Sequence, residues 1–164
     1  MDVLRRIEQQ VDVVRELSEE LRVERSYRGV ERLVQLTIQA LLDLGLMALS
    51  AMGASPTGYR DVATSLGRLG LLPLKDAELM RAMAGLRNVL VHGYVGVNRE
   101  IAVESSRRLP RDAVRLAEEI LSSSRPRMDE NQGIVGDLAE ALRASSRIGS
   151  GWPSSLALRL RAIA

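Results

Sequence analysis

The sequence predicts an all-α fold, and three observations support this prediction. Aromatic residues make up only 2% of the 164 residues and Phe is absent, so the apolar mass is aliphatic. The chain is rich in Leu, Ala, Arg and Glu, which favour helices over sheets. Apolar residues recur at helical spacing, and no stretch of any length alternates as a strand does. We therefore expect a helical bundle that is large enough to bury a core.

Two long helices are predicted in the first third of the chain. In residues 2–25, apolar side chains recur at helical spacing between charges, which is typical of an amphipathic helix. After a break at Gly29, the segment from Glu31 to Gly53 is apolar on most faces. We expect it to form a largely buried second helix that ends at Gly53. Three polar residues are embedded in it: Gln35, Gln39 and Asp43.

Two further helices are predicted in the middle of the chain. A short one begins at Thr57 or Tyr59, runs to Arg68 and stops near Gly70. The next begins around Lys75 and runs to His92, with Gly93 as its terminator. One face of this helix carries a predicted apolar stripe of Leu79, Met83, Leu86 and Leu90.

The last third is predicted to contain several helices separated by breaks. A short helix over 98–108 is expected to break at Leu109 and Pro110, with Pro110 opening the next helix. The polar stretch "SSSRPRMDENQG" predicts a boundary near Ser124, so the expected domains are a bundle over 1–124 and a short helical extension over 125–164. The break "GSGWP" contains Trp152, a candidate anchor for this extension.

Composition narrows the function classes. The absence of cysteine excludes disulfides, thiolate metal sites and a cysteine nucleophile. The pI is about 9.5, although the formal net charge is only +2, and a basic protein fits a polyanionic partner. A preference for arginine over lysine that comes from genome composition or from a hot habitat explains the high pI at least as well. No apolar run is expected to reach the roughly 20 residues of a membrane helix, and the charged N-terminus does not resemble a signal peptide. We therefore expect a cytoplasmic protein without a membrane partner.

The stretch "GLRNVLVHGYVGVN" contains the only histidine of the chain, His92. On a helix, residues four apart share a face, so Asn88 lies on the same face as His92. Arg87 lies beside that face, and its long side chain must bend around the helix to reach the same place. Arginine offers a planar fork of donors that suits a phosphate, and histidine exchanges a proton near neutral pH. Together these side chains suit the cleavage of an RNA phosphodiester.

In that reaction a base takes the proton of the 2′-hydroxyl, an acid protonates the leaving 5′-oxygen, and a cation stabilises the charged phosphorane. One His92 cannot easily be acid and base at once, whereas a two-fold dimer supplies a second copy. A metal site is disfavoured because a lone histidine without adjacent carboxylates or thiolates is a poor ligand set. By spacing alone, a lone histidine at this place is more often a residue that caps the C-terminus of its helix or compensates the helix dipole.

Three segments carry a family resemblance in the order "SYRGVERLVQLTIQALLDLG", "SPTGYRDVATSLGRLGLL" and "MAGLRNVLVHGYVGVNREIAVESSRRLP". Over Tyr27 to Ser124 the chain resembles the HepT-like family of the HEPN superfamily, and "RNVLVHGY" looks like its Arg-x4-His-x-Tyr signature. The resemblance implies an antiparallel HEPN-type bundle that dimerises around the signature. It also implies a metal-independent endoribonuclease toxin with Arg87 and His92 as catalytic residues.

The same resemblance implies partners and roles for other residues. A minimal nucleotidyltransferase antitoxin is the expected partner, and Tyr94 is the position that it would adenylylate. Asn88 matches a polar position that orients RNA or His92. Asp43 matches a recurring acidic position, for which we favour a structural role. Tyr27 is interpreted as a packing and helix-start residue.

Two alternatives stay open at this point. The chain could be a non-catalytic helical module that binds a nucleotide or a nucleotidyltransferase. The segment after Ser124, where the resemblance ends, could be a lid, a dimer brace, an antitoxin dock or simple packing. No cofactor is expected, RNA is the expected substrate, and the expected homodimer interface includes the helix from Lys75 to His92.

Overall fold

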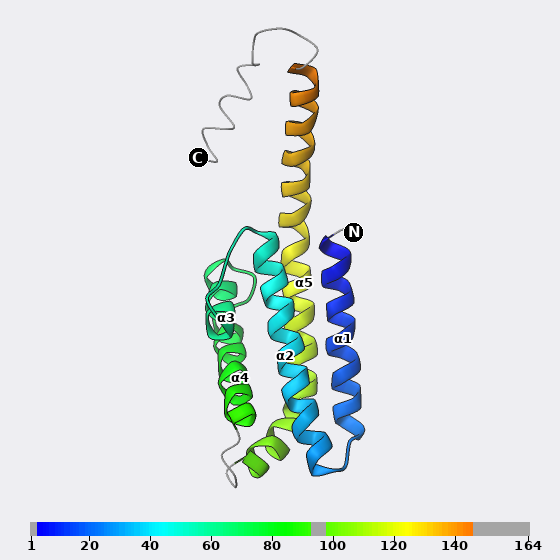
Figure 1. Ribbon diagram of the computed structural model, residues 1–164, viewed down its shortest axis with the longest axis vertical. Coiled ribbons are helices and arrows are strands. Elements are labelled where there is room, and N and C mark those ends of the chain that lie inside the picture. Colours follow the sequence, from blue (N-terminus) through cyan, green and yellow to red (C-terminus); the bar gives the residue numbers. More distant parts are fainter. Residues whose placement is uncertain (1–2, 93–97, 146–164) are drawn as a thin grey trace. The chain divides into compact units, whose positions relative to one another are not determined.

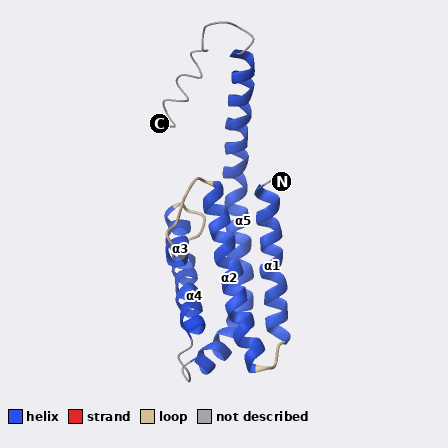
Figure 2. Cartoon of the chain, viewed as in Figure 1, coloured by secondary structure: helices blue, strands red, loops and turns tan. Residues whose placement is uncertain are grey.

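The computed structural model describes residues 3–92 and 98–145, which fold into five helices without a strand in these ranges (Figures 1 and 2). The helices are α1 (Val3–Val23), α2 (Tyr27–Ala51), α3 (Tyr59–Arg68), α4 (Leu74–His92) and α5 (Asn98–Ser145). The all-α prediction is confirmed, and the first four helices lie close to their predicted bounds. Gly93, Tyr94 and Trp152 lie outside the described residues, so the predictions for them are not addressed by the structure.

The second helix, α2, is the central element of the bundle and contacts α1, α3 and α4 (Figure 1). Its apolar faces supply a large share of the buried core, together with the inward faces of α1 and α5. By length and mean hydropathy α2 could cross a membrane, so the expectation that no segment reaches that length was wrong. In the bundle 56% of its most apolar window is buried, which is typical of the core helix of a soluble protein.

The start of α2 also differs from the prediction, because Gly29 does not break the chain. Ser26 is the N-cap, and its hydroxyl accepts a hydrogen bond from the backbone N–H of Gly29 at 3.1 Å. This bond satisfies one of the four N–H groups that a helix leaves unpaired at its start. Gly29 therefore lies in the first turn of α2, two residues after the helix begins.

The turns around α3 follow the sequence signals. Gly53 after α2 and Gly70 after α3 have φ values of 75° and 69°, a conformation that glycine adopts without strain. On α4 the buried residues are Ala77, Met80, Met83, Ala84 and Leu90. Leu79 and Leu86 are half-buried and pack against the same core as Met83 and Leu90, as the predicted apolar face of this helix requires.

The predicted break at Leu109 and Pro110 was wrong, because α5 continues through Pro110 and Pro126. A proline inside a helix removes one backbone hydrogen bond and bends the helix. Figure 1 shows such a bend near the start of α5. Leu109 and Pro110 are both buried, and Leu116 and Ile120 further along are fully buried in the same core. Packing of the residues around the bend offsets the missing hydrogen bond and keeps the helix continuous.

The chain divides into two compact units, residues 1–128 and 129–164. Ser124 lies within continuous helix, is buried, and its hydroxyl donates to the carbonyl of Ile120 at 2.6 Å. A helix break near Ser124 is therefore absent. The division of the protein into domains over 1–124 and 125–164 stays a prediction.

Gly45 on α2 allows α3 and α4 to approach closely. A Cβ at this position would lie 2.9 Å from side-chain carbons of both Val62 and Leu66, and 3.1 Å from Met80 Cε. We predict that Gly45→Ala lowers the free energy of unfolding by about 1 to 2 kcal/mol, because the cost of overpacking exceeds the gain in helix propensity. Urea unfolding followed by circular dichroism measures this effect.

Gly136 on α5 provides the matched control, since nothing lies within 4 Å of a Cβ built there. Gly136→Ala should leave stability unchanged or raise it by up to about 1 kcal/mol, as expected for an exposed helical glycine. Equal effects of the two substitutions would show that the contact around Gly45 is looser than the structure indicates.

Candidate active site

The predicted catalytic residues lie in the last two turns of α4. Arg87 and Asn88 are half-buried, whereas His92 is exposed and is the final residue of the helix. The carbonyl of Leu90 is one of the last four in α4, which have no partner within the helix. The side-chain amide of Gln35 on α2 donates to this carbonyl at 3.4 Å. A polar group of the buried helix thus supports the end of α4 that carries the site.

The guanidinium of Arg87 is held from two other helices. Its Nε donates to Oε1 of Gln39 on α2 at 2.8 Å. Its Cζ lies 5.3 Å from the ring centroid of Tyr59 on α3, in cation–π contact. Nη1 makes a long contact of 3.4 Å with Oδ1 of Asn88. Among the described residues the terminal nitrogens have no other hydrogen-bond partner, so they keep donors for a ligand.

Asp43 anchors this arrangement from one turn further along α2. Its Oδ1 accepts from Nε2 of Gln39 at 2.8 Å and from the hydroxyl of Tyr59 at 2.9 Å. Nε2 of Gln39 also donates to the hydroxyl oxygen of Tyr59. Because both donors of the amide face Asp43 and Tyr59, its oxygen is turned toward Arg87. Asp43 therefore acts on Arg87 through Gln39, without touching it.

Burial raises the pKa of Tyr59, with a further contribution from the neighbouring carboxylate of Asp43, while the hydrogen bond from Gln39 acts in the opposite direction. Tyr59 therefore remains a neutral phenol at physiological pH, able to donate to Asp43 and accept from Gln39 at once. The hydrogen-bond directions in the cluster are mutually consistent, and each half-buried polar side chain in it has a partner.

The structure brings together Arg87 and Asn88, and connects Asp43 to Arg87 through Gln39. His92 lies one turn beyond Asn88 on the same helix, and within the described ranges its imidazole makes no hydrogen bond. Sequence reasoning missed Gln39 and Tyr59 as parts of the site. The signal was present in Gln35, Gln39 and Asp43, which recur every fourth residue and form a polar stripe, named here the α2 stripe, on an otherwise apolar helix.

Within residues 3–92 and 98–145, no group of three or more His, Asp or Glu side chains is arranged to hold a metal ion. A shallow hollow of about 360 Å³ lies between α4 and α5, on the side where Leu79 and Leu86 are half-exposed. Ile101 and Leu109 of α5 form its other wall. Its lining is mostly apolar, with Glu104, Arg108 and Asp112 as the charged residues.

Comparison with solved structures shows that other chains share this helical fold. A cytosolic protein of unknown function, YutE from Bacillus subtilis, superposes with a TM-score of 0.61 at 16% identity, over 79% of this chain and 92% of that one. A chain from a crystal structure of a toxin–antitoxin with AMP-PNP gives a TM-score of 0.60 at 18% identity, over 73% and 99% of the two chains. At these identities the likeness concerns the fold alone.

Sequence comparison identifies the family. Residues 2–120 match the family Ribonuclease HepT-like, so the chain belongs to the HepT-like ribonucleases. A protein of Archaeoglobus fulgidus described as "Putative RNase" is 26% identical over 126 residues, which cover 75% of this chain and 96% of that protein. The resemblance read from the sequence is confirmed, and the family supports an enzyme that cleaves RNA.

The hydrogen bond between Gln39 and Arg87 can be tested without any activity. We predict that a double-mutant cycle of Gln39→Leu and Arg87→Ala, followed by urea unfolding, gives a coupling free energy of about 1 to 2 kcal/mol. The physical reason is that the charged Nε donor and the amide oxygen are each other's partners in a half-buried place. The matched control is Gln35→Leu with Arg87→Ala, on the same helix but without a shared contact. Coupling below about 0.3 kcal/mol in the first cycle would show that Gln39 does not hold Arg87.

Proposed function

We propose that this protein is an endoribonuclease toxin that cleaves RNA without a metal ion and acts as a homodimer. The observation that carries the proposal is Arg87, held by α2 and α3 with its terminal donors unused, five residues before the exposed His92. Membership of the HepT-like ribonuclease family supports RNA as the substrate. The toxin–antitoxin chain of similar fold supports the role of a toxin.

In the proposed reaction the 2′-oxygen attacks the adjacent phosphorus and the bond from phosphorus to the 5′-oxygen breaks. His92 of one protomer takes the proton of the 2′-hydroxyl, and His92 of the other gives a proton to the leaving 5′-oxygen. Arg87 binds the phosphate and stabilises the charge of the phosphorane. Asn88 orients the RNA beside Arg87. The products are a 2′,3′-cyclic phosphate and a 5′-hydroxyl.

The proposed dimer places the ends of two α4 helices against each other. Val89, next to Asn88 and on the same face of α4 as the hollow, is 39% exposed, and Ile101 near the start of α5 is 36% exposed. Together with the apolar hollow between α4 and α5, these residues offer a surface that a second copy of the chain can cover in a two-fold, self-complementary interface. Such a dimer brings two His92 side chains to one cleft.

We further propose that the protein acts in the cytoplasm and that residues 125–164 form an extension outside the catalytic bundle. The similar fold of YutE, a cytosolic protein, supports the first point. The end of the family match at residue 120 supports the second. Asp43 is proposed as a positioning residue for Arg87 and not as a catalytic group, because its contacts run through Gln39 and Tyr59.

The nuclease is tested with purified protein and a labelled single-stranded RNA in the presence of EDTA. We predict cleavage by the wild type and a loss of at least about a hundredfold in rate for Arg87→Ala and for His92→Ala, since each removes transition-state stabilisation or proton transfer. Lys75→Ala at the opposite end of α4 is the control and should retain activity. Light scattering of the same samples should give the mass of a dimer.

Undiminished cleavage by either variant would contradict the assignment of its residue, and activity of a strict monomer would contradict the shared site. RNA that stays intact, together with tight binding to a nucleotidyltransferase partner, would favour the alternative of a non-catalytic binding module.

We propose that a minimal nucleotidyltransferase antitoxin silences the enzyme by adenylylating Tyr94. An adenylyl group two residues after His92 would place an anion at the phosphate-binding cleft and repel RNA. After coexpression with such a partner, intact-mass analysis should show one or more added adenylyl groups that disappear in Tyr94→Phe. Tyr59→Phe is the control, because Tyr59 is held within the bundle, and it should keep the adduct. An adduct that persists in Tyr94→Phe would point to another site.

A further inference from the structure

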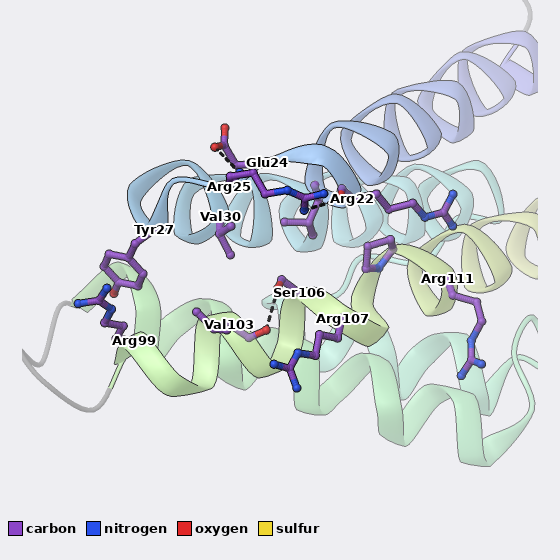
Figure 3. Close-up of a pocket in the computed structure, with 12 residues that line it drawn as sticks. Arg22, Glu24, Arg25, Tyr27, Val30, Arg99, Val103, Ser106, Arg107 and Arg111 are labelled. Atoms are coloured by element: carbon purple, nitrogen blue, oxygen red, sulfur yellow. Dashed lines mark hydrogen bonds between the residues drawn. The ribbon is translucent and has the colours of Figure 1, made fainter.

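A second cavity, of about 520 Å³, lies away from α3 and is unusually rich in arginine (Figure 3). It is formed by the end of α1, the start of α2 and the first turns of α5. Five arginines and a single glutamate are the charged residues of its lining. The arginines are Arg22, Arg25, Arg99, Arg107 and Arg111. None of these residues belongs to the α4 site.

The glutamate, Glu24, does not neutralise the arginines across the cavity. Its Oε1 accepts hydrogen bonds from the backbone N–H groups of Arg25 at 2.8 Å and Ser26 at 2.7 Å. These bonds lower the pKa of Glu24, so the carboxylate stays charged while it caps the turn before α2. Figure 3 shows Glu24 pointing away from Arg99 and Arg107. The positive charge of the cavity is therefore left without a compensating group at its centre.

Only two of the five arginines of the cavity contact a carboxylate among the described residues. Arg22 forms an exposed ion pair with Glu19, and Arg111 approaches its neighbour Asp112 at 3.5 Å. Within the part of the chain that the structure describes, Arg25, Arg99 and Arg107 have no ion-pair partner. Two carboxylates, Glu100 and Glu104, line an adjoining hollow with Arg99 and Arg107 but form no ion pair with them. Like charges gathered in one cavity destabilise the fold unless an anion binds there.

The spacing of the charges fits a chain of phosphates better than one anion. Arg99, Arg107 and Arg111 follow one another on α5 at intervals of eight and four residues. Arg22 and Arg25 lie on the opposite wall. A line of guanidinium groups on both sides of a groove matches the repeated charges of a nucleic-acid backbone.

Tyr27 fixes one end of this line. The guanidinium of Arg99 lies 4.9 Å from the centroid of the Tyr27 ring, in cation–π contact. Burial raises the pKa of Tyr27, and the neighbouring carboxylate of Glu31 raises it further, so the phenol stays neutral. Glu31 is a negative charge close to this end of the groove, and it faces the phenol of Tyr27. The planar guanidinium of Arg99, held on this ring, also offers a face on which an unpaired base can stack.

The groove is within reach of the α4 site. His92 and Arg99 are seven positions apart in the sequence, so the two side chains start from backbone positions at most about 25 Å apart. A strand of a few nucleotides can span that distance. We propose that the cavity between α1, α2 and α5 binds the phosphates of a single-stranded RNA segment next to the scissile bond. This inference rests on the proposed function for the identity of the polyanion.

The test measures RNA binding, so that it does not depend on cleavage. The full chain carrying His92→Ala is titrated into a fluorescein-labelled single-stranded RNA of 20 nucleotides, and anisotropy is recorded at 50 to 200 mM KCl. We expect a weaker affinity, by about tenfold, when this variant also carries Arg99→Gln, Arg107→Gln and Arg111→Gln. The slope of log K against log salt concentration should also decrease in magnitude by about 2, because each phosphate that is no longer bound contributes about 0.7. The double variant Arg107→Gln, Arg111→Gln leaves the contact of Tyr27 intact and should show about two thirds of the slope change.

The matched control replaces Arg5, Arg6 and Arg68, three exposed arginines outside the cavity, by Gln, and should change the affinity by less than about threefold. Equal losses in the control, or unchanged affinity in the groove variants, would overturn the proposal. A labelled tetranucleotide that binds as tightly as the longer RNA would also overturn it, because the cavity would then hold one anion. If the protein binds RNA through the groove but does not cleave it, the RNA-binding groove is supported and the proposed nuclease activity is contradicted. If the protein cleaves RNA but the groove variants bind RNA as tightly as the wild type, the nuclease activity is supported and the groove is contradicted.

Discussion

The structure depends on one constraint, which is that the half-buried amides and carboxylate of Gln35, Gln39 and Asp43 on α2 must find hydrogen-bond partners. The smaller hydroxyl of Thr37, fully buried on the same helix, has none among the described residues. The α2 stripe lies on the central helix of the bundle, and water cannot fully solvate its amides and carboxylate. Each member is satisfied by a different neighbour: Gln35 by the end of α4, Gln39 by Arg87, and Asp43 by Tyr59. The need to satisfy α2 therefore positions the end of α4 and the arginine that it carries.

This coupling explains how a chain without cysteine, and with a single histidine, can organise the proposed site. The candidate catalytic side chains are few, so the position of Arg87 is set by residues that take no part in the proposed reaction. Tyr59 and Gln39 hold the guanidinium from two sides and leave its outer donors unused by the described residues. His92 is exposed at the last position of α4. The proposed phosphate chemistry rests on a fixed cation five residues before an exposed imidazole on the same helix.

The same bundle also separates two kinds of positive charge. Arg87 is half-buried and restrained by three contacts, as expected of a group that must meet a transition state. The arginines around Arg99 and Arg107 lie in an open cavity and, apart from the ring of Tyr27, are loosely held. Loosely held charges can follow a flexible backbone and bind it without selecting a sequence. The proposed cleavage would then take place at the end of α4, and the RNA strand would be held by the arginines of α1 and α5.

The sequence by itself determined the helical class, four of the five helices, the family and the positions of Arg87 and His92, because helical periodicity and a compact motif are local properties. It failed at Gly29 and at Pro110, where a cap and a packed core outweighed local signals. Only the tertiary structure decided what lies around the motif. The contacts of Arg87 with Gln39 and Tyr59, and the arginine groove of α1, α2 and α5, join residues 28 to 89 positions apart. Such contacts depend on how helices pack, which the spacing of residues along one helix does not specify.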